Sequence, residues 1–584
     1  MSILKNLTKS KHFNILYAIF LNIAVCAFFV CTIPTLYFLP DERVFTEFIT
    51  GGMYYIPVTN YFLCKAIGII QNLIYPLNAF VIVHLLLALI SFITITKIFL
   101  DKFSVWVSTC FILFISGFFA IKHYVTVSFS FLPSLLTIAG LLCIIHYSKK
   151  EKWILGTVFG CALALIGSTY RFVVFEAALA VVAVYILTKS LSEYYSITVS
   201  DRRFVRFLKI LFEKKRLVFC AALLILAFVL NSASTQINTS TPELKYYLQY
   251  NSVRSAVWDY KIPDYEDCKE EYDNIGIDEN DIAMLRLQYV DDEGAFSYNT
   301  LKQIKSIKDN YNVKTRSVFD TLKNMVVYEA GCVFGLEDKG VASVAGALTL
   351  MFFLLIMKKR NYFIPVGMIV VTAAIYSFVW IKGRPALRGV YMAWLGMIVF
   401  LLYSVSASEM RDYVKRIYRK RKTVCKTVLI LLCLIISVCG LYMSKAGNVT
   451  SGNYTSDEND YALLDYMNEH KDSKFEIARN SGFNYNPNSD IYHVTRRDPY
   501  QNFLFMKGTY YKSPYFIEVY KDFGTDNYYS NLLNDNVYSV NSHDKSGAEI
   551  MRKYLQKYYS NGKTVTFETV DTVGDFEILK YRVE

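Results

Sequence analysis

The chain has 584 residues, of which 54% are hydrophobic and only 19% are charged. Soluble globular chains are roughly 45–50% apolar and about 25% charged, so this composition excludes an ordinary soluble protein, and its hydrophobicity excludes a disordered one. The formal net charge of +12 comes from short basic clusters between apolar blocks. Because no basic-aromatic module accompanies these clusters, we expect no nucleic-acid binding.

The apolar residues form about eleven blocks, each near the roughly 20 residues that a helix needs to cross a bilayer. The first block follows three lysines and lacks a small-x-small cleavage site, so we expect a retained membrane span and not a signal peptide. The sequence therefore predicts a polytopic α-helical membrane protein. The predicted spans are 13–38, 79–100, 104–121, 125–147, 153–168, 172–189, 217–233, 341–357, 362–381, 386–406 and 425–443.

The basic clusters predict the topology, because cationic loops stay in the cytoplasm. With the N-terminus inside, every basic loop is cytoplasmic and the C-terminus is outside. We expect a multi-pass protein of the cell membrane with two large extracytoplasmic parts. Its predicted parts are an N-terminal membrane module at 1–233 with an outer loop at 39–78, an outer helical loop at 234–340, a second membrane module at 341–443, and a C-terminal extracytoplasmic α/β domain at 444–584.

The two polar segments carry their own secondary-structure signals. Residues 277–282 offer helix-capping residues ahead of the apolar Met284, Leu285 and Leu287. We expect a polar helix at 299–308 and an amphipathic helix at 315–327 that returns the chain to the bilayer. Cys268 and Cys332 could pair if 234–340 is external. In the C-terminal segment we expect helices at 457–469 and 545–559, and strands at 475–477, 515–517, 564–567 and 576–579.

The leading candidate for chemistry is the acidic pair Asp41-Glu42, which directly follows the first span with Arg43 as a supporting cation. Two carboxylates at the outer mouth of a span could take a hydroxyl proton or hold a divalent cation such as Mg²⁺ or Mn²⁺. Proline followed by acids is also an ordinary helix start. The amphipathic stretch 44–75, expected to form a re-entrant or interfacial loop over the pair, favours the functional interpretation.

Cations follow other spans on the same predicted side. Arginine presents a two-pronged donor that suits phosphate, so several arginines around a cavity could bind a lipid phosphate and stabilise it as a leaving group; the alternative is contact with headgroups. Glu176 lies at membrane depth, where a carboxylate normally faces a partner or a wet cavity. The candidate cations are Lys122, Arg171, Arg384 and Arg388, with His123 as a supporting residue.

Four stretches carry a family resemblance: Asp41-Glu42 with Thr50-Gly51-Gly52, Tyr170-Arg171-Phe172, residues 251–292, and Gly383-Arg384 with Arg388. With them, the chain resembles the GT-C superfamily of polytopic membrane glycosyltransferases, and most closely a group of uncharacterised Gram-positive membrane proteins of that type. The resemblance implies that Asp41 or Glu42 is the catalytic base. Lys122-His123 stands where many members carry a second acidic motif, which places a two-carboxylate metal site in doubt.

The resemblance further implies a reaction at the outer face of the membrane. The donor would be a polyprenyl-phosphate sugar, and the acceptor a cell-surface or cell-wall polysaccharide, a teichoic-acid-like polymer or a lipid. Transfer would invert the anomeric carbon, while Arg171, Arg384, Arg388 and Lys122 hold the leaving phosphate. Three alternatives remain open. The first is a polysaccharide polymerase or ligase, and the second is a transporter or flippase of a lipid-linked substrate, although the sequence has no Gly/Pro-broken repeats of the kind common in transporters. The third is a non-enzymatic surface or assembly protein, which the outer domain alone would permit.

Overall fold

The structure is a computed structural model that divides into two compact units. We name the unit of 1–49, 58–235 and 318–453 the membrane unit, and the unit of 50–57, 236–317 and 454–584 the polar unit. The structure describes residues 12–37, 40–56, 58–148, 153–195, 214–258, 260, 262–315, 317–334, 338–356, 362–382, 387–418, 438, 442, 458–478, 481–483, 491–496, 498, 500–506, 510–544 and 546–584.

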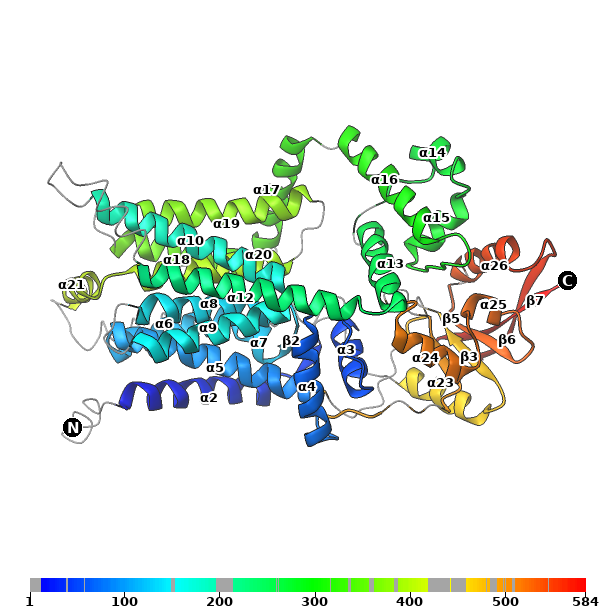
Figure 1. The fold of residues 1–584 in the computed structure, drawn as a ribbon, viewed down its shortest axis with the longest axis horizontal. Helices are drawn as coiled ribbons and strands as arrows, with labels where there is room; N and C mark the ends of the chain where they lie inside the picture. Colours follow the sequence, from blue (N-terminus) through cyan, green and yellow to red (C-terminus); the bar gives the residue numbers. More distant parts are fainter. Residues whose placement is uncertain are drawn as a thin grey trace. The chain divides into compact units, whose positions relative to one another are not determined.

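Long apolar helices that lie side by side make up most of the membrane unit (Figure 1). Two short strands, β1 (Leu36–Tyr37) and β2 (Thr126–Val127), pair in parallel between them. The helices are α2 (Phe13–Thr32), α3 (Pro40–Thr50), α4 (Tyr61–Ile74), α5 (Ala79–Lys102), α6 (Val105–Phe119), α7 (Ile121–Tyr124), α8 (Leu132–Tyr147), α9 (Trp153–Tyr170), α10 (Phe172–Tyr195), α12 (Lys214–Asn238), α17 (Val318–Phe334), α18 (Asp338–Ile356), α19 (Phe363–Ile381), α20 (Leu387–Ser404) and α21 (Ala407–Tyr418).

Five helical segments among the described residues are long and apolar enough to cross a membrane: Phe13–Thr32, Ala79–Lys102, Phe172–Glu193, Ala221–Asn238 and Phe363–Ile381. A sixth span results if α20 and α21, bent by 78° at their junction, count as one. The chain is therefore a helical membrane protein. Shorter apolar helices (α6, α8, α9, α18) occupy other predicted spans, and 425–443 lies almost entirely outside the described residues, so the expected count of about eleven spans stays a prediction.

Glycines bring α8 and α9 into backbone contact. A Cβ atom on Gly140 would lie 2.5 Å from the carbonyl oxygen of Gly160, and one on Gly160 would lie 2.6 Å from that of Gly140. Small residues allow this close approach between apolar helices. Near the C-terminal end of α9, a Cβ atom on Gly167 would lie 2.4 Å from Thr137 Oγ1 of α8. The two helices are thus antiparallel, and the start of α8 lies beside the end of α9.

The stretch 44–75 folds as α3 and α4 with a turn between them. The side chain of Asn60 caps α4 by accepting from Phe62 N at 3.0 Å, and its Nδ2 donates to the Leu230 carbonyl of α12 at 3.1 Å. Ile67 of α4 is buried whereas Leu73 is 79% exposed. One face of α4 therefore packs on the unit, and the other carries exposed apolar side chains; whether the helix lies at the membrane interface stays a prediction.

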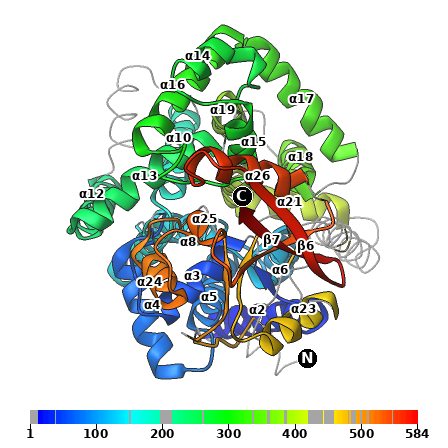
Figure 2. The same cartoon turned by 90° about the vertical axis from the view of Figure 1, so that its right-hand side faces the viewer.

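The polar unit combines helices with a five-stranded sheet of order β4-β3-β5-β7-β6, in which β3 is parallel to β4 and β5, and β7 is antiparallel to β5 and β6. Helix α26 packs against β6 (Figure 2). Its elements are α13 (Pro242–Trp258), η1 (Glu266–Cys268), α14 (Lys269–Asp273), α15 (Glu279–Arg286), α16 (Tyr298–Thr315), α23 (Glu458–Glu469), β3 (Lys474–Ile477), β4 (Phe503–Phe505), α24 (Pro514–Phe523), α25 (Tyr528–Asn531), β5 (Val537–Ser542), α26 (Ser546–Tyr558), β6 (Val565–Val573) and β7 (Phe576–Val583).

The strand predicted at 515–517 is wrong, because these residues lie in helix α24. Ser513 caps this helix by accepting from Phe516 N at 3.3 Å, and Gly524 ends it with a left-handed conformation at φ 77°. A serine cap before proline and a terminal glycine are strong helix signals. These flanking signals outweigh the strand-like pattern of three consecutive apolar residues.

The capping residues predicted within 277–282 are confirmed, and they are Asp278 and Asp281. Asp281 N donates to Asp278 Oδ1 at 2.9 Å and Asp278 N donates to Asp281 Oδ2 at 3.1 Å, which closes a reciprocal capping box at the start of α15. Lys557 of α26 donates to both carboxylates at 2.7 Å. The same cap therefore also ties α15 to the C-terminal segment.

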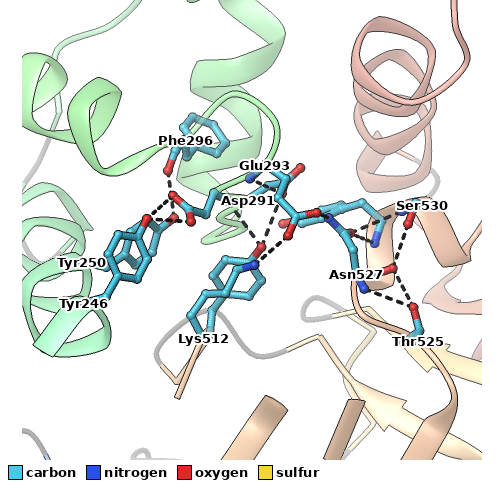
Figure 3. A network of polar contacts seen from close by, with 12 residues as sticks. Tyr246, Tyr250, Asp291, Glu293, Phe296, Lys512, Thr525, Asn527 and Ser530 are labelled. Carbon is cyan, nitrogen blue, oxygen red and sulfur yellow. Dashed lines mark hydrogen bonds and ion pairs between the residues drawn. The ribbon is translucent and has the colours of Figure 1, made fainter. Parts of the chain in front are cut away.

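A second set of polar contacts joins the same two segments around Asp291 and Glu293 (Figure 3). Asp291 Oδ2 accepts from the hydroxyls of Tyr559 at 2.5 Å and Tyr554 at 3.0 Å. Glu293 accepts from Lys512 at 2.7 Å and Asn527 at 2.9 Å. The two polar stretches, which lie more than two hundred positions apart at these contacts, therefore fold as one body.

Glu476 of β3 is a fully buried carboxyl that accepts from Asn531 Nδ2 at 2.7 Å. Burial raises its pKa well above its usual value, so the folded state holds its proton more tightly than the unfolded chain. The stabilisation by protonated Glu476 is complete below the unfolded pKa, and it is lost as pH rises through the folded pKa.

We therefore expect Glu476→Gln, which is neutral at every pH, to raise the urea midpoint of the polar unit at pH 8 and to match the parent protein at pH 4. Urea titrations at both values measure this difference. Equal midpoints at pH 8 would contradict the assignment of a proton to buried Glu476.

Candidate functional site

The predicted acidic pair lies in α3, which is anchored at its base. Tyr37 of β1 shares a hydrogen bond with Thr46 at 3.2 Å and accepts from Asn78 Nδ2 at 2.7 Å, and burial raises the pKa of Tyr37 to about 12. Glu42 is fully buried. The backbone of Asp41 is part of the same helix, but its side chain is not among those that the structure describes. The helix thus holds Glu42 inside the membrane unit.

The segment 126–131, between α7 and α8, collects several of the predicted cations. Arg171 donates from Nη1 to Ser130 Oγ at 2.5 Å, and its guanidinium lies 5.2 Å from the ring centre of Phe129. Lys122, only 3% exposed, lies 5.9 Å from the ring centre of Phe131. This meeting follows from the antiparallel pair α8 and α9, because Arg171 follows α9 where α8 begins.

The same segment also contacts α3. The rings of Phe45 and Phe129 lie 4.8 Å apart, so the ring that Arg171 covers also packs on the helix that carries the acidic pair. Strand β1 precedes α3 and strand β2 begins segment 126–131. The two strands pair with Leu36 opposite Thr126. The structure therefore brings α3 (through Phe45), Lys122 and Arg171 to one segment, although they are far apart in the sequence.

His123 and α20 complete the surroundings of this segment. His123 Nε2 shares a hydrogen bond with Tyr391 Oη at 3.2 Å, and the Tyr391 ring lies 4.9 Å from that of Phe131. Burial lowers the pKa of His123 well below its usual range, so this histidine is neutral and adds no positive charge. Arg388 precedes Tyr391 by three residues in α20, so its backbone lies near the same segment.

The remaining predicted site residues lie elsewhere or are not described. Arg43 pairs with Glu47 at 3.3 Å along α3, and Glu176 of α10 is exposed on the surface of the unit. Arg384 and the side chain of Arg388 lie outside the described residues. Cys268 and Cys332 are both buried, in the polar unit and the membrane unit respectively.

The groups around segment 126–131 do not fit a divalent cation. The described side chains that contact this segment are a guanidinium, an ammonium, hydroxyls and aromatic rings, whereas Mg²⁺ and Mn²⁺ need several carboxylate or carbonyl oxygens. Within the part of the chain that the structure describes, no three His, Cys, Asp or Glu residues gather into a metal-binding group. The arrangement suits an anion instead, because Arg171 is fixed by Ser130 and only partly enclosed.

Sequence reasoning missed the residues that fix the predicted ones. No local sequence pattern marks these residues as part of a site, since a serine or an aromatic residue is common in an apolar chain. They are Tyr37, Phe129, Ser130 and Tyr391. Their roles arise from the pairing of β1 with β2 and of α8 with α9. Comparison with known proteins adds no assignment: no family model, no curated protein and no solved structure matches this chain.

Proposed function

We propose that the chain is a membrane glycosyltransferase of GT-C type, which moves a sugar from a polyprenyl-phosphate donor to an acceptor at the outer face of the membrane. One observation carries the proposal: α3, with Asp41-Glu42, packs through Phe45 on the ring of Phe129 that Arg171 also contacts. A carboxylate helix and a fixed guanidinium on one segment supply the base and the phosphate-binding group that such a transfer needs.

In this mechanism the carboxylate of Asp41 takes the proton of an acceptor hydroxyl. The oxygen attacks the anomeric carbon from the face opposite the phosphate, a new glycosidic bond forms, and the bond from that carbon to the phosphate oxygen breaks with its electron pair. The configuration of the carbon inverts. Polyprenyl phosphate leaves with the added charge, which Arg171 stabilises, with Lys122 and the α20 arginine Arg388 assisting.

The burial of Glu42 bears on which carboxylate is the base. A base must approach within hydrogen-bond distance of the proton that it removes, and Glu42 is enclosed by the protein. We therefore assign the proton transfer to Asp41, and to Glu42 the positioning of α3. No step in this scheme requires a metal ion bound by the residues around segment 126–131.

Sugar transfer in lipid nanodiscs tests the proposal. The purified full-length chain is given radiolabelled polyprenyl-phosphate hexoses and a mixture of cell-surface glycan fragments, and the product linkage is determined by NMR. We expect labelled product with an inverted anomeric centre. Movement of intact donor across the bilayer of proteoliposomes without any transfer would instead identify a flippase.

The same assay tests the role of Arg171. We expect Arg171→Gln to lower kcat about 10²–10³-fold, the loss typical of removing one group that stabilises transition-state charge. Arg411→Gln, which changes an exposed arginine of α21, is the matched control and should retain full activity. Equal activity of the two variants would remove Arg171 from the phosphate-binding role.

A further inference from the structure

The polar unit contains a cavity of about 540 Å³ between the η1–α14 turn and α16. We name it the α14–α16 pocket. Its volume falls within the roughly 300–1,000 Å³ of ligand pockets. The polar side chains that matter for its chemistry are Asp267, Glu271, Asn274, Gln303, Asn310 and Tyr311.

The lining combines hydrogen-bond donors with acceptors. A side-chain amide both donates and accepts hydrogen bonds, and a carboxylate accepts them. A sugar hydroxyl can donate and accept, so neighbouring hydroxyls of a sugar can pair with a lining of amides and carboxylates. The side chains of Asn274, Gln303 and Asn310 form no hydrogen bond with any residue that the structure describes. Their capacity therefore remains for water or a ligand.

One contact fixes the orientation of the acidic wall. Tyr311 donates from its hydroxyl to Asp267 Oδ2 at 3.0 Å, which holds the carboxylate and the aromatic ring together at the edge of the pocket. Ile275, Ile307 and buried Cys268 add apolar side chains to the lining. The fixed carboxylate suits the hydroxyl groups at the edge of a sugar ring. The aromatic ring and the apolar side chains suit the face that its C–H groups form.

The charge of the lining selects among ligands. Asp267 and Glu271 line the pocket and no lysine or arginine does, so a phosphate-bearing chain would meet only like charge there. A second cavity, of about 500 Å³, is different, because Arg286 lines it and forms an ion pair with Asp264. Of these two cavities, the α14–α16 pocket is the one whose lining combines amides and carboxylates without a cation.

We propose that the α14–α16 pocket binds an uncharged saccharide, which is the glycan part of the acceptor. The identification of this saccharide as the acceptor rests on the proposed function. The inference narrows the class of acceptor, because a neutral polysaccharide fits the pocket and a poly(glycerol phosphate) chain does not.

Binding to the full-length chain in nanodiscs tests the inference. The probes are an N-acetylglucosamine tetramer, a glucose tetramer and poly(glycerol phosphate), followed by saturation-transfer NMR and calorimetry. We expect a neutral tetramer to bind saturably, and Asn310→Leu or Gln303→Leu to weaken its binding at least about tenfold, the effect of losing roughly one good hydrogen bond to a ligand.

Asn299→Leu is the matched control, because Asn299 is an exposed asparagine of the same helix outside the pocket; it should leave binding unchanged. The inference falls if neither neutral tetramer binds, if Asn310→Leu and Asn299→Leu behave alike, or if poly(glycerol phosphate) binds in a manner sensitive to Asn310→Leu.

The outcome is separable from that of the proposed function. Saccharide binding is measured without donor, so an active transferase whose pocket variants bind normally would overturn the pocket and leave the transferase intact. Binding that depends on Asn310 in a chain that transfers no sugar would support the pocket as a glycan site and overturn the transferase.

Discussion

Asp41→Asn is expected to lower sugar transfer by about 10²–10⁴-fold, because the amide cannot take the proton of the acceptor hydroxyl and general-base catalysis is typically worth this much. The substitution preserves size and keeps the position in the first turn of α3, where Pro40 begins the helix. The effect should fall on kcat with little change in the KM for the donor, since Arg171 and Lys122 are left intact. Initial rates in nanodiscs over a range of donor concentrations measure both constants.

Glu42→Gln is the comparison variant for this experiment. Because Glu42 is fully buried, its substitution should change the thermal midpoint of the membrane unit more than the turnover of the folded protein. A variant with Asp41→Asn that retains full activity would overturn the proposed mechanism. A loss of turnover in folded Glu42→Gln, with activity retained in Asp41→Asn, would exchange the roles of the two carboxylates.

Asp291→Ala is expected to destabilise the polar unit by about 2–4 kcal/mol, because it leaves the hydroxyls of Tyr554 and Tyr559 without their acceptor and each orphaned buried group costs roughly 1–3 kcal/mol. Asp291 is fully buried between the two segments and Tyr554 is fully buried as well. Proteolysis pulses at increasing urea, with cleavage sites mapped by mass spectrometry, measure the midpoint of this unit.

Asp309→Ala provides the control for Asp291→Ala. Asp309 lies on α16 with half of its side chain exposed. It pairs with Lys305 at 2.8 Å and more distantly with Lys308 at 3.6 Å. Exposed ion pairs contribute roughly 0–1 kcal/mol, so this variant should nearly match the parent protein. If Asp291→Ala unfolded no earlier than Asp309→Ala, the network in Figure 3 would not be what joins the two segments.

Much of the secondary structure could be predicted from local patterns. Apolar blocks of roughly span length became helices, such as α5 and α19, and the stretch 277–282 supplied the expected cap of α15. The local approach failed at 515–517, where three apolar residues resembled a strand but Ser513 and Gly524 enclose a helix. The signals for this helix are local as well, but they lie at its two ends and outside the apolar run that predicted a strand.

The candidate site was predictable only as a set of residues, without its arrangement. Charged groups beside spans are conspicuous in an apolar chain, so Arg171 and Lys122 could be named in advance. Their convergence on segment 126–131 depends on Gly140 and Gly160, which bring α8 and α9 together, and on the pairing of Leu36 with Thr126. Contacts of this kind join residues tens of positions apart, and no local periodicity reports them.

The sequence by itself determined that this is a helical membrane protein with two polar segments, because transfer of apolar blocks into lipid depends on composition and length alone. Only the tertiary structure decided that these segments form one body through Asp291, Glu293 and Lys557, and that the α14–α16 pocket opens within it. The physical reason is that hydrogen bonds between distant residues depend on geometry, which the chain acquires only when it folds.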